Sequence, residues 1–196
     1  MSDKQFLIPG LAAIALAILF PFYWIYGVGV VDFELSGKGI ANGLQALDFV
    51  FLVLGALTAY FYVSVRRALH EHYHYSSLDV VFACMIGLVV LFHVSTFALD
   101  AMAANVGSDL ASEIIVVITL LCMFAFGVLD IVIGVMLLRS ANDRPEILRV
   151  FAIANLIMGV LEVTILLSVG VIVVFPLVLV IMAMYFMRSP EVVEFV

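Results

Sequence analysis

Five long hydrophobic blocks, at about residues 6–31, 41–65, 78–98, 114–138 and 148–187, constrain what this chain can fold into. A helix needs about 20 apolar residues to cross about 30 Å of lipid hydrocarbon, and the first four blocks each match one crossing. The fifth block would form a helix about 60 Å long, twice the hydrocarbon thickness, so we expect it to break. Ser168, Val169 and Gly170 form the natural turn, because glycine adopts backbone angles that other residues resist.

These blocks predict an all-α, polytopic membrane protein with six transmembrane helices, the last two at about 148–167 and 171–187. The composition agrees with this prediction. Of the 196 residues, 66% are hydrophobic and 12% are charged, whereas an ordinary soluble domain is about half apolar and about a quarter charged. The connections are too short for a separate soluble domain, so residues 1–196 are expected to form a single transmembrane domain.

The basic residues are predicted to gather on one side of the membrane. With six spans, the side that holds both chain termini receives Lys4, Arg66, Arg67, Arg139, Arg144, Arg149 and Arg188. The opposite side receives Lys38. Such an excess marks the cytoplasmic side of a membrane protein, so both termini are expected in the cytoplasm and the protein in the cell inner membrane. The net charge of −7 argues against a nucleic-acid partner.

Four ionisable side chains lie deep inside the predicted spans. Counted at 1.5 Å per residue from the cytoplasmic helix ends, Asp130 lies about 13 Å, Glu162 about 20 Å, His93 about 22 Å and Asp48 about 27 Å above that face. Ionisable groups at such depths are costly and commonly mark ion or proton pathways. These four residues are therefore candidates for a functional site.

The spacing of small and polar residues predicts which helix faces meet. One face of helix 148–167 carries Ala152, Asn155, Gly159 and Glu162, and one face of helix 114–138 carries Gly127, Asp130 and Gly134. Small residues let membrane helices approach closely, and polar residues hydrogen-bond across the contact. A short loop joins the two helices, so we expect antiparallel neighbours in which Asp130 meets Asn155 or Glu162.

Two interpretations of these polar residues remain open. In the functional one, low dielectric keeps the carboxyl groups largely neutral, and they exchange protons or bind a cation along a water-lined route. In the structural one, they hydrogen-bond their neighbours and fix helix register or subunit contacts. No lysine or arginine lies inside a predicted span to neutralise the acids. For His93, the partners indicated by spacing are Thr96 and Asp100.

The segment HisGluHisTyrHis at 70–74 suggests a weak metal site. On a helix, His70 and His74 would lie four residues apart on one face, a spacing that can chelate a divalent ion. A histidine-rich and tyrosine-rich membrane interface beside Arg66 and Arg67 is the alternative, and we predict neither a metal site nor a cofactor. Enzyme signatures such as HisGluxxHis, GxSxG or a P-loop do not occur, so no enzymatic activity is predicted.

The sequence favours a small channel or transporter-like protein for protons or a small cation. Asp130 and Glu162 would carry the site, Asn155 would orient them, and Asp48 and His93 would form the outer approach. The alternative function is a non-catalytic membrane subunit whose polar residues serve helix packing. A homo-oligomer or a larger membrane complex is expected in either case, with the lipid bilayer as the surrounding medium.

Overall fold

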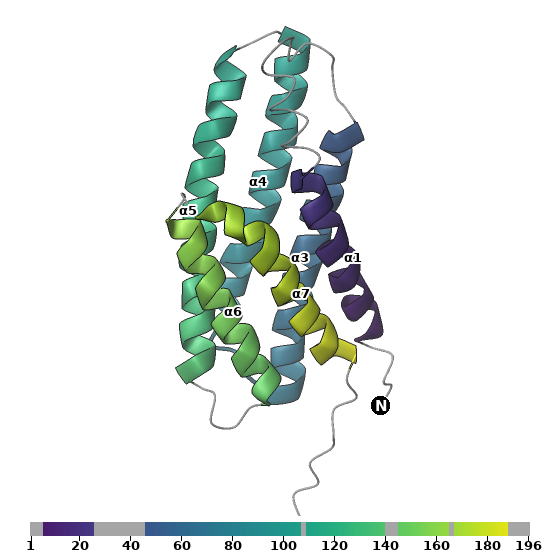
Figure 1. Ribbon diagram of the computed structural model, residues 1–196, viewed down its shortest axis with the longest axis vertical. Helices are drawn as coiled ribbons and strands as arrows, with labels where there is room; N and C mark the ends of the chain where they lie inside the picture. The colour runs from purple at the N-terminus through teal and green to yellow at the C-terminus, as the bar shows by residue number, and fades with distance from the viewer. Residues whose placement is uncertain (1–5, 26–45, 107–108, 140–144, 165–166, 188–196) are drawn as a thin grey trace, which may run out of the picture.

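The computed structural model describes residues 6–25, 46–106, 109–139, 145–164 and 167–187, and these fold into helices (Figure 1). In chain order the elements are α1 (Leu7–Tyr23), α3 (Ala46–Tyr73), α4 (Asp79–Val106), α5 (Asp109–Arg139), α6 (Glu146–Val163), the 3₁₀ turn η3 (Ser168–Gly170) and α7 (Val171–Met187). No strand occurs within these ranges. The prediction of an all-α protein is confirmed.

The six α-helices form a closed ring. Each helix packs against the next one along the chain, and α7 closes the ring by packing against α1. The contact between α5 and α6 is the most extensive of these. From α3 to α7 the connections are short, which makes these consecutive helices antiparallel neighbours. The ring leaves a central space that side chains from all six helices can reach.

The predicted break in the last hydrophobic block is confirmed, since η3 occupies 168–170 and α7 covers 171–187 as expected. Other boundaries were wrong. Helix 41–65 continues to Tyr73, and helix 78–98 continues to Val106. Hydrophobicity marks the apolar part of a helix and not its end, and charged side chains continue α3 beyond Val65. Residues 26–31, 41–45 and 165–166 of the predicted spans lie outside the described residues.

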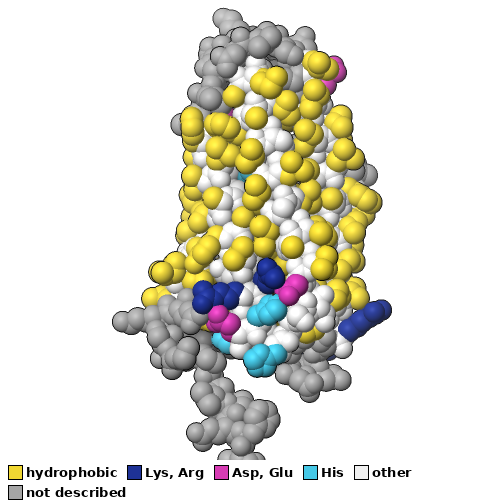
Figure 2. Space-filling model, turned by 180° about the vertical axis from the view of Figure 1, so that it is seen from behind, with side chains coloured by type: hydrophobic (Ala, Val, Ile, Leu, Met, Phe, Trp, Pro, Cys, Tyr) yellow, Lys and Arg dark blue, Asp and Glu magenta, His cyan; other side chains and the backbone are white. Residues whose placement is uncertain are grey.

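The outer surface of the ring is apolar along its length, and its basic side chains lie at one end. Figure 2 shows hydrophobic side chains over the flank of the molecule, with arginine and histidine side chains gathered at one end and acidic side chains at both ends. Three helices are long and apolar enough to cross a membrane: Leu47–Tyr73, Asp79–Met102 and Glu113–Arg139. The apolar helices α1 and α7 have 17 residues each. These helices indicate a membrane protein.

Helix α6 is much shorter than α5, its neighbour in the ring. It has 18 residues and contains Glu146, Arg149 and Glu162, and its turn into α7 lies partway along α5 (Figure 1). Because α5 is longer, with 31 residues, α6 and α7 cover only part of it. Val116, Val117 and Leu121 on the uncovered part of α5 are exposed.

The hydrophobic core fills the ring toward its basic end. Its largest fully buried side chains include Phe61, Phe82, Ile133, Phe151 and Met182. Farther along the ring, beyond this core, the packing opens into a cavity. The core therefore forms a floor on the side of the arginines, and the cavity lies on the other side of that floor.

Candidate functional site

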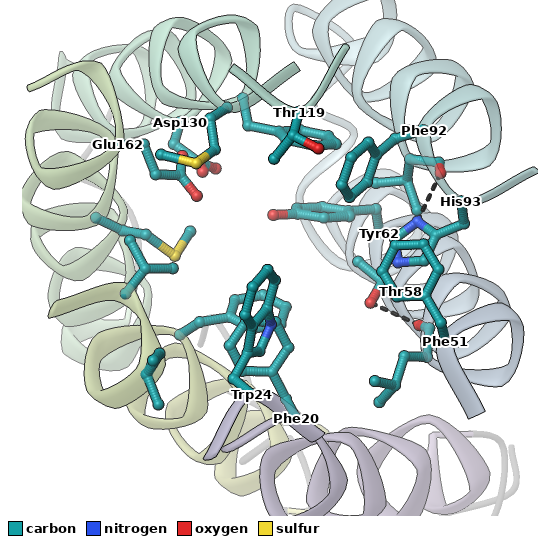
Figure 3. A pocket seen from close by; sticks show the side chains of 18 of the residues that line it. Phe20, Trp24, Phe51, Thr58, Tyr62, Phe92, His93, Thr119, Asp130 and Glu162 are labelled. Atoms are coloured by element: carbon teal, nitrogen blue, oxygen red, sulfur yellow. Dashed lines mark hydrogen bonds between the residues drawn. The ribbon is translucent and has the colours of Figure 1, made fainter. Parts of the chain in front are cut away.

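A cavity of about 270 Å³ occupies the centre of the ring (Figure 3). Side chains from all six α-helices and from η3 line it, and most of them are apolar or aromatic. The polar lining side chains are Thr58, Tyr62, His93, Thr119, Asp130 and Glu162. An apolar cavity with a few convergent polar groups is the usual form of a ligand site or of a pathway through a helix bundle.

The two most buried acids of the described chain meet at the wall of this cavity. Asp130 on α5 is 1% exposed and Glu162 on α6 is 9% exposed, and their carboxyl groups are within hydrogen-bonding reach of each other. Figure 3 shows them side by side. One oxygen of each group, Oδ1 of Asp130 and Oε2 of Glu162, has no hydrogen-bond partner. The sequence-based expectation that Asp130 meets a polar group of α6 is thus fulfilled by Glu162.

Glycines bring α5 and α6 close enough for this contact. A Cβ atom on Gly127 would lie 2.7 Å from the Gly159 carbonyl oxygen, and one on Gly134 would lie 2.7 Å from the Ala152 carbonyl oxygen. The helices therefore touch backbone to backbone, which only glycine permits. Since Asp130 and Glu162 each follow one of these glycines by three residues, the contact turns both acids toward the same space.

Tyr62 reaches the carboxyl pair from α3. Its side chain is buried, and its hydroxyl group is within hydrogen-bonding reach of Asp130. Tyr62 is not among the site residues predicted from the sequence, because a helix predicted to end at Val65 would leave a tyrosine at the membrane interface. The continuation of α3 to Tyr73 places Tyr62 inside the ring instead.

His93 on α4 lines the cavity and stacks on Phe51, with ring centroids 4.3 Å apart. Its Nδ1 lies 2.8 Å from the Val89 carbonyl oxygen. Because a carbonyl oxygen only accepts, Nδ1 carries a proton in this arrangement. The expected bond to Thr96 does not form, since the Thr96 hydroxyl is buried without a partner.

Gly55 makes room for His93, so Gly55→Ala is expected to disturb the cavity. A Cβ atom at position 55 would lie 2.4 Å from Cγ of His93. The imidazole must move, and we expect a loss of stability of about 1 to 3 kcal/mol. Thermal unfolding followed by circular dichroism measures the effect. Gly87→Ala, on α4 with nothing within 4 Å of the added atom, is the control. Equal melting temperatures for the two variants would contradict the described packing of His93.

Asn155 and Asp48 take less direct positions. Asn155 is fully buried, and its Nδ2 donates to the Phe151 carbonyl oxygen at 2.8 Å, while its Oδ1 has no partner. No hydrogen bond to the carboxyl pair is found for it, and its orienting role stays a prediction. Asp48 lies in the first turn of α3, close to Tyr23 and Asp100. It is not among the described residues that line the cavity.

The weak metal candidates are not paired by a helix. α3 ends at Tyr73, and His74 follows it with a φ of 50°, so the helical spacing with His70 is broken. His70 Nε2 instead lies 2.6 Å from Asp79 Oδ1, which Arg66 Nε also contacts at 2.9 Å. Within the described residues no group of three or more histidine, cysteine or acidic side chains is placed to hold a metal ion.

The rest of this segment joins α3 to α7. His72 Nδ1 lies 2.7 Å from the Tyr185 hydroxyl oxygen, and that hydroxyl donates to the Tyr73 hydroxyl at 3.4 Å. The ring of Phe6 lies 5.0 Å from the ring of His72. These contacts form an aromatic and histidine-rich layer at the basic end of the ring, which was the alternative interpretation of the segment.

The fold and the site define a helical membrane protein with a ring of six helices around an acid-containing cavity. No protein-family model, no curated protein and no solved structure matches the chain.

Proposed function

We propose that the protein is a six-span, multi-pass inner-membrane protein with both termini in the cytoplasm, and that it conducts or transports protons or a small cation. Three long apolar helices, two apolar helices of 17 residues and α6 supply six candidate crossings. Arg66, Arg67, Arg139 and Arg149 support this orientation, because an excess of arginine marks the cytoplasmic side.

The observation that carries the proposal is the pair of buried carboxyl groups without a basic partner. The ion pairs found in the described residues are Arg66–Asp79, Arg67–Glu71 and His70–Asp79, all at the basic end of the ring. Two carboxylates in contact at low dielectric cannot both be ionised cheaply, so the pair holds at least one proton or a cation. A structural contact alone would not need two acids that line a cavity.

Each candidate residue then has a role. Asp130 and Glu162 take up and release the proton or cation. Tyr62 stabilises the ionised form of Asp130 by donating a hydrogen bond from its hydroxyl group. His93 lines the route farther along the cavity. Asp48, with Asp100 close by, forms the outer approach, and Asn155 supports the pair from the next turns of α6.

Flux through purified protein in liposomes tests the proposal. A pH gradient is imposed, a potassium ionophore removes the counter-potential, and an internal pH dye follows the proton concentration. We expect the gradient to collapse faster than in liposomes without protein. A second experiment imposes a sodium or potassium gradient in place of the pH gradient and tests for transport of a small cation. Leak rates equal to those of empty liposomes in all gradients would reject a channel or transporter function.

The alternative proposal, a non-catalytic membrane subunit, is supported by the uncovered part of α5. Val116, Val117 and Leu121 lie there in a row of exposed apolar side chains that α6 and α7 do not reach. The native mass of the protein extracted gently from its own membrane separates the two functions. A stoichiometric second polypeptide would favour the subunit, whereas a monomer or homo-oligomer would favour an independent transporter.

A further inference from the structure

We propose that the cavity binds a monovalent organic ammonium ion with an apolar body, held between the carboxyl pair and an aromatic wall. This inference rests on the proposed function, since it names the class of cation that the Asp130–Glu162 pair would exchange for a proton. It follows from the composition, the size and the polar groups of the cavity.

The aromatic wall distinguishes this cavity from a metal-ion site. Its aromatic members besides Tyr62 are Phe20, Trp24, Phe51, Phe92, Phe126 and Phe175. Their ring edges and faces interlock, as in the T-shaped contact of Phe20 with Phe175 at 4.7 Å. Aromatic faces attract a cation that keeps an apolar surface, and this attraction reaches about 2 kcal/mol where water is excluded.

Within the described residues, no three histidine, cysteine or acidic side chains gather to hold a desolvated metal cation. Ca²⁺, for example, takes about six to eight oxygen ligands. The lining hydroxyl groups are those of Thr58, Tyr62 and Thr119, and they lie on α3 and α5 among mostly apolar side chains. The two carboxyl groups neutralise one positive charge but cannot replace a full hydration shell. An ammonium ion with hydrocarbon substituents loses little hydration and needs little replacement.

The size of the cavity limits the apolar body. An apolar protein cavity of about 150 Å³ holds one benzene molecule. The volume of about 270 Å³ therefore has room for one aromatic ring that carries a small ammonium group. Benzyltrimethylammonium has these dimensions, and its permanent charge removes any ambiguity about the protonation of the probe itself.

Exchange with a proton follows from the charge balance of the pair. A buried pair that carries two protons is neutral, and a bound monocation keeps the site neutral by replacing one of them, so about one proton leaves. The other titratable groups that face the pair are the Tyr62 hydroxyl from α3 and His93 from α4, while the described lining residues of α1, α6 and α7 add only Glu162 itself. Since protons and probe compete, the Kd for the probe falls as pH rises.

Trp24 is the sole tryptophan of the chain and lines the cavity, so its fluorescence reports binding directly. Purified full-length protein in lipid nanodiscs is titrated with benzyltrimethylammonium chloride, with sodium chloride at equal ionic strength and with benzyl alcohol as an uncharged aromatic. We expect a saturable change with the ammonium ion, binding at least about tenfold weaker for benzyl alcohol, and tighter ammonium binding at mildly alkaline than at mildly acidic pH.

Two variants and a matched control complete the test. Asp130→Asn combined with Glu162→Gln removes the charge, and we expect it to abolish the fluorescence change. Phe92→Leu removes one aromatic face with the pair intact, and we expect weaker binding that keeps its pH dependence. Phe49→Leu, on the exposed side of α3, should bind like the wild type. No saturable change in the wild type, or equal binding by the double variant, overturns the inference.

The liposome assay keeps this inference separate from the proposed function. Proton flux that depends on the pair, without binding of the ammonium ion, would overturn the substrate class and leave proton transport standing. Binding without any flux would support the site and reject transport. Failure of both measurements would reject both proposals.

Discussion

Liposomes that carry the combined variant Asp130→Asn and Glu162→Gln are expected to lose proton flux by at least about tenfold, because amides keep the shape and hydrogen bonds of the acids but cannot exchange a proton. The free energy of unfolding is expected to change by less than about 1 kcal/mol, since no buried charge loses a partner. The flux assay and thermal unfolding of the same preparation measure both effects.

The result separates the two interpretations of the buried acids. If they served only to fix the contact of α5 with α6, the amide variant would assemble normally and retain whatever flux the wild type shows. Retained flux would therefore reject Asp130 and Glu162 as the conducting site. Glu146→Gln is the matched control, because Glu146 is an exposed acid in the first turn of the same helix, and its loss should leave flux unchanged.

The acid pair was accessible to sequence reasoning because three signals agreed. Asp130 and Glu162 each interrupt a long apolar run, each follows a glycine by three residues, and the short loop between their helices brings the two faces together. Periodicity and connection length are local properties that can be read directly from the sequence. The confirmed break at 168–170 has the same origin. The length of the last hydrophobic block requires a break, and Gly170 marks its place.

The cavity could not be predicted from the sequence. Its aromatic wall combines Phe20 of α1, Phe92 of α4 and Phe175 of α7, which are far apart in the chain and meet only when α7 closes the ring against α1. Phenylalanine is also common throughout the chain, with 16 occurrences, so no single one stood out. Tyr62 is not predicted for a related reason, because the charged residues that continue α3 mark the end of a hydrophobic block in the sequence.

The metal candidate failed through a local backbone feature. His70 and His74 have helical spacing in the sequence, but the helix ends between them and His74 adopts a left-handed conformation. The short connection to Asp79 then favours a different pairing, in which Arg66 and His70 share one carboxylate. Spacing alone does not reveal a helix end where neither proline nor glycine marks it.

Gly159→Leu is expected to be strongly destabilising. A Cβ atom at this position would lie 2.5 Å from the Gly127 carbonyl oxygen and 2.9 Å from the Ile131 backbone nitrogen. Backbone atoms cannot rotate away as side chains can, so α6 must move from α5. We expect a loss of about 3 kcal/mol or more in the free energy of unfolding.

Proton flux should fall in the same variant, because separation of the helices also separates Asp130 from Glu162. Gly87→Leu is the control for the added side chain itself. Gly87 is exposed, and a Cβ atom there would meet nothing within 4 Å. This control should melt at or slightly above the wild-type temperature, since leucine favours a helix over glycine by up to about 1 kcal/mol. Equal melting of Gly159→Leu and Gly87→Leu would show that α5 and α6 do not touch backbone to backbone, and the carboxyl pair would lose the contact that holds it at the cavity.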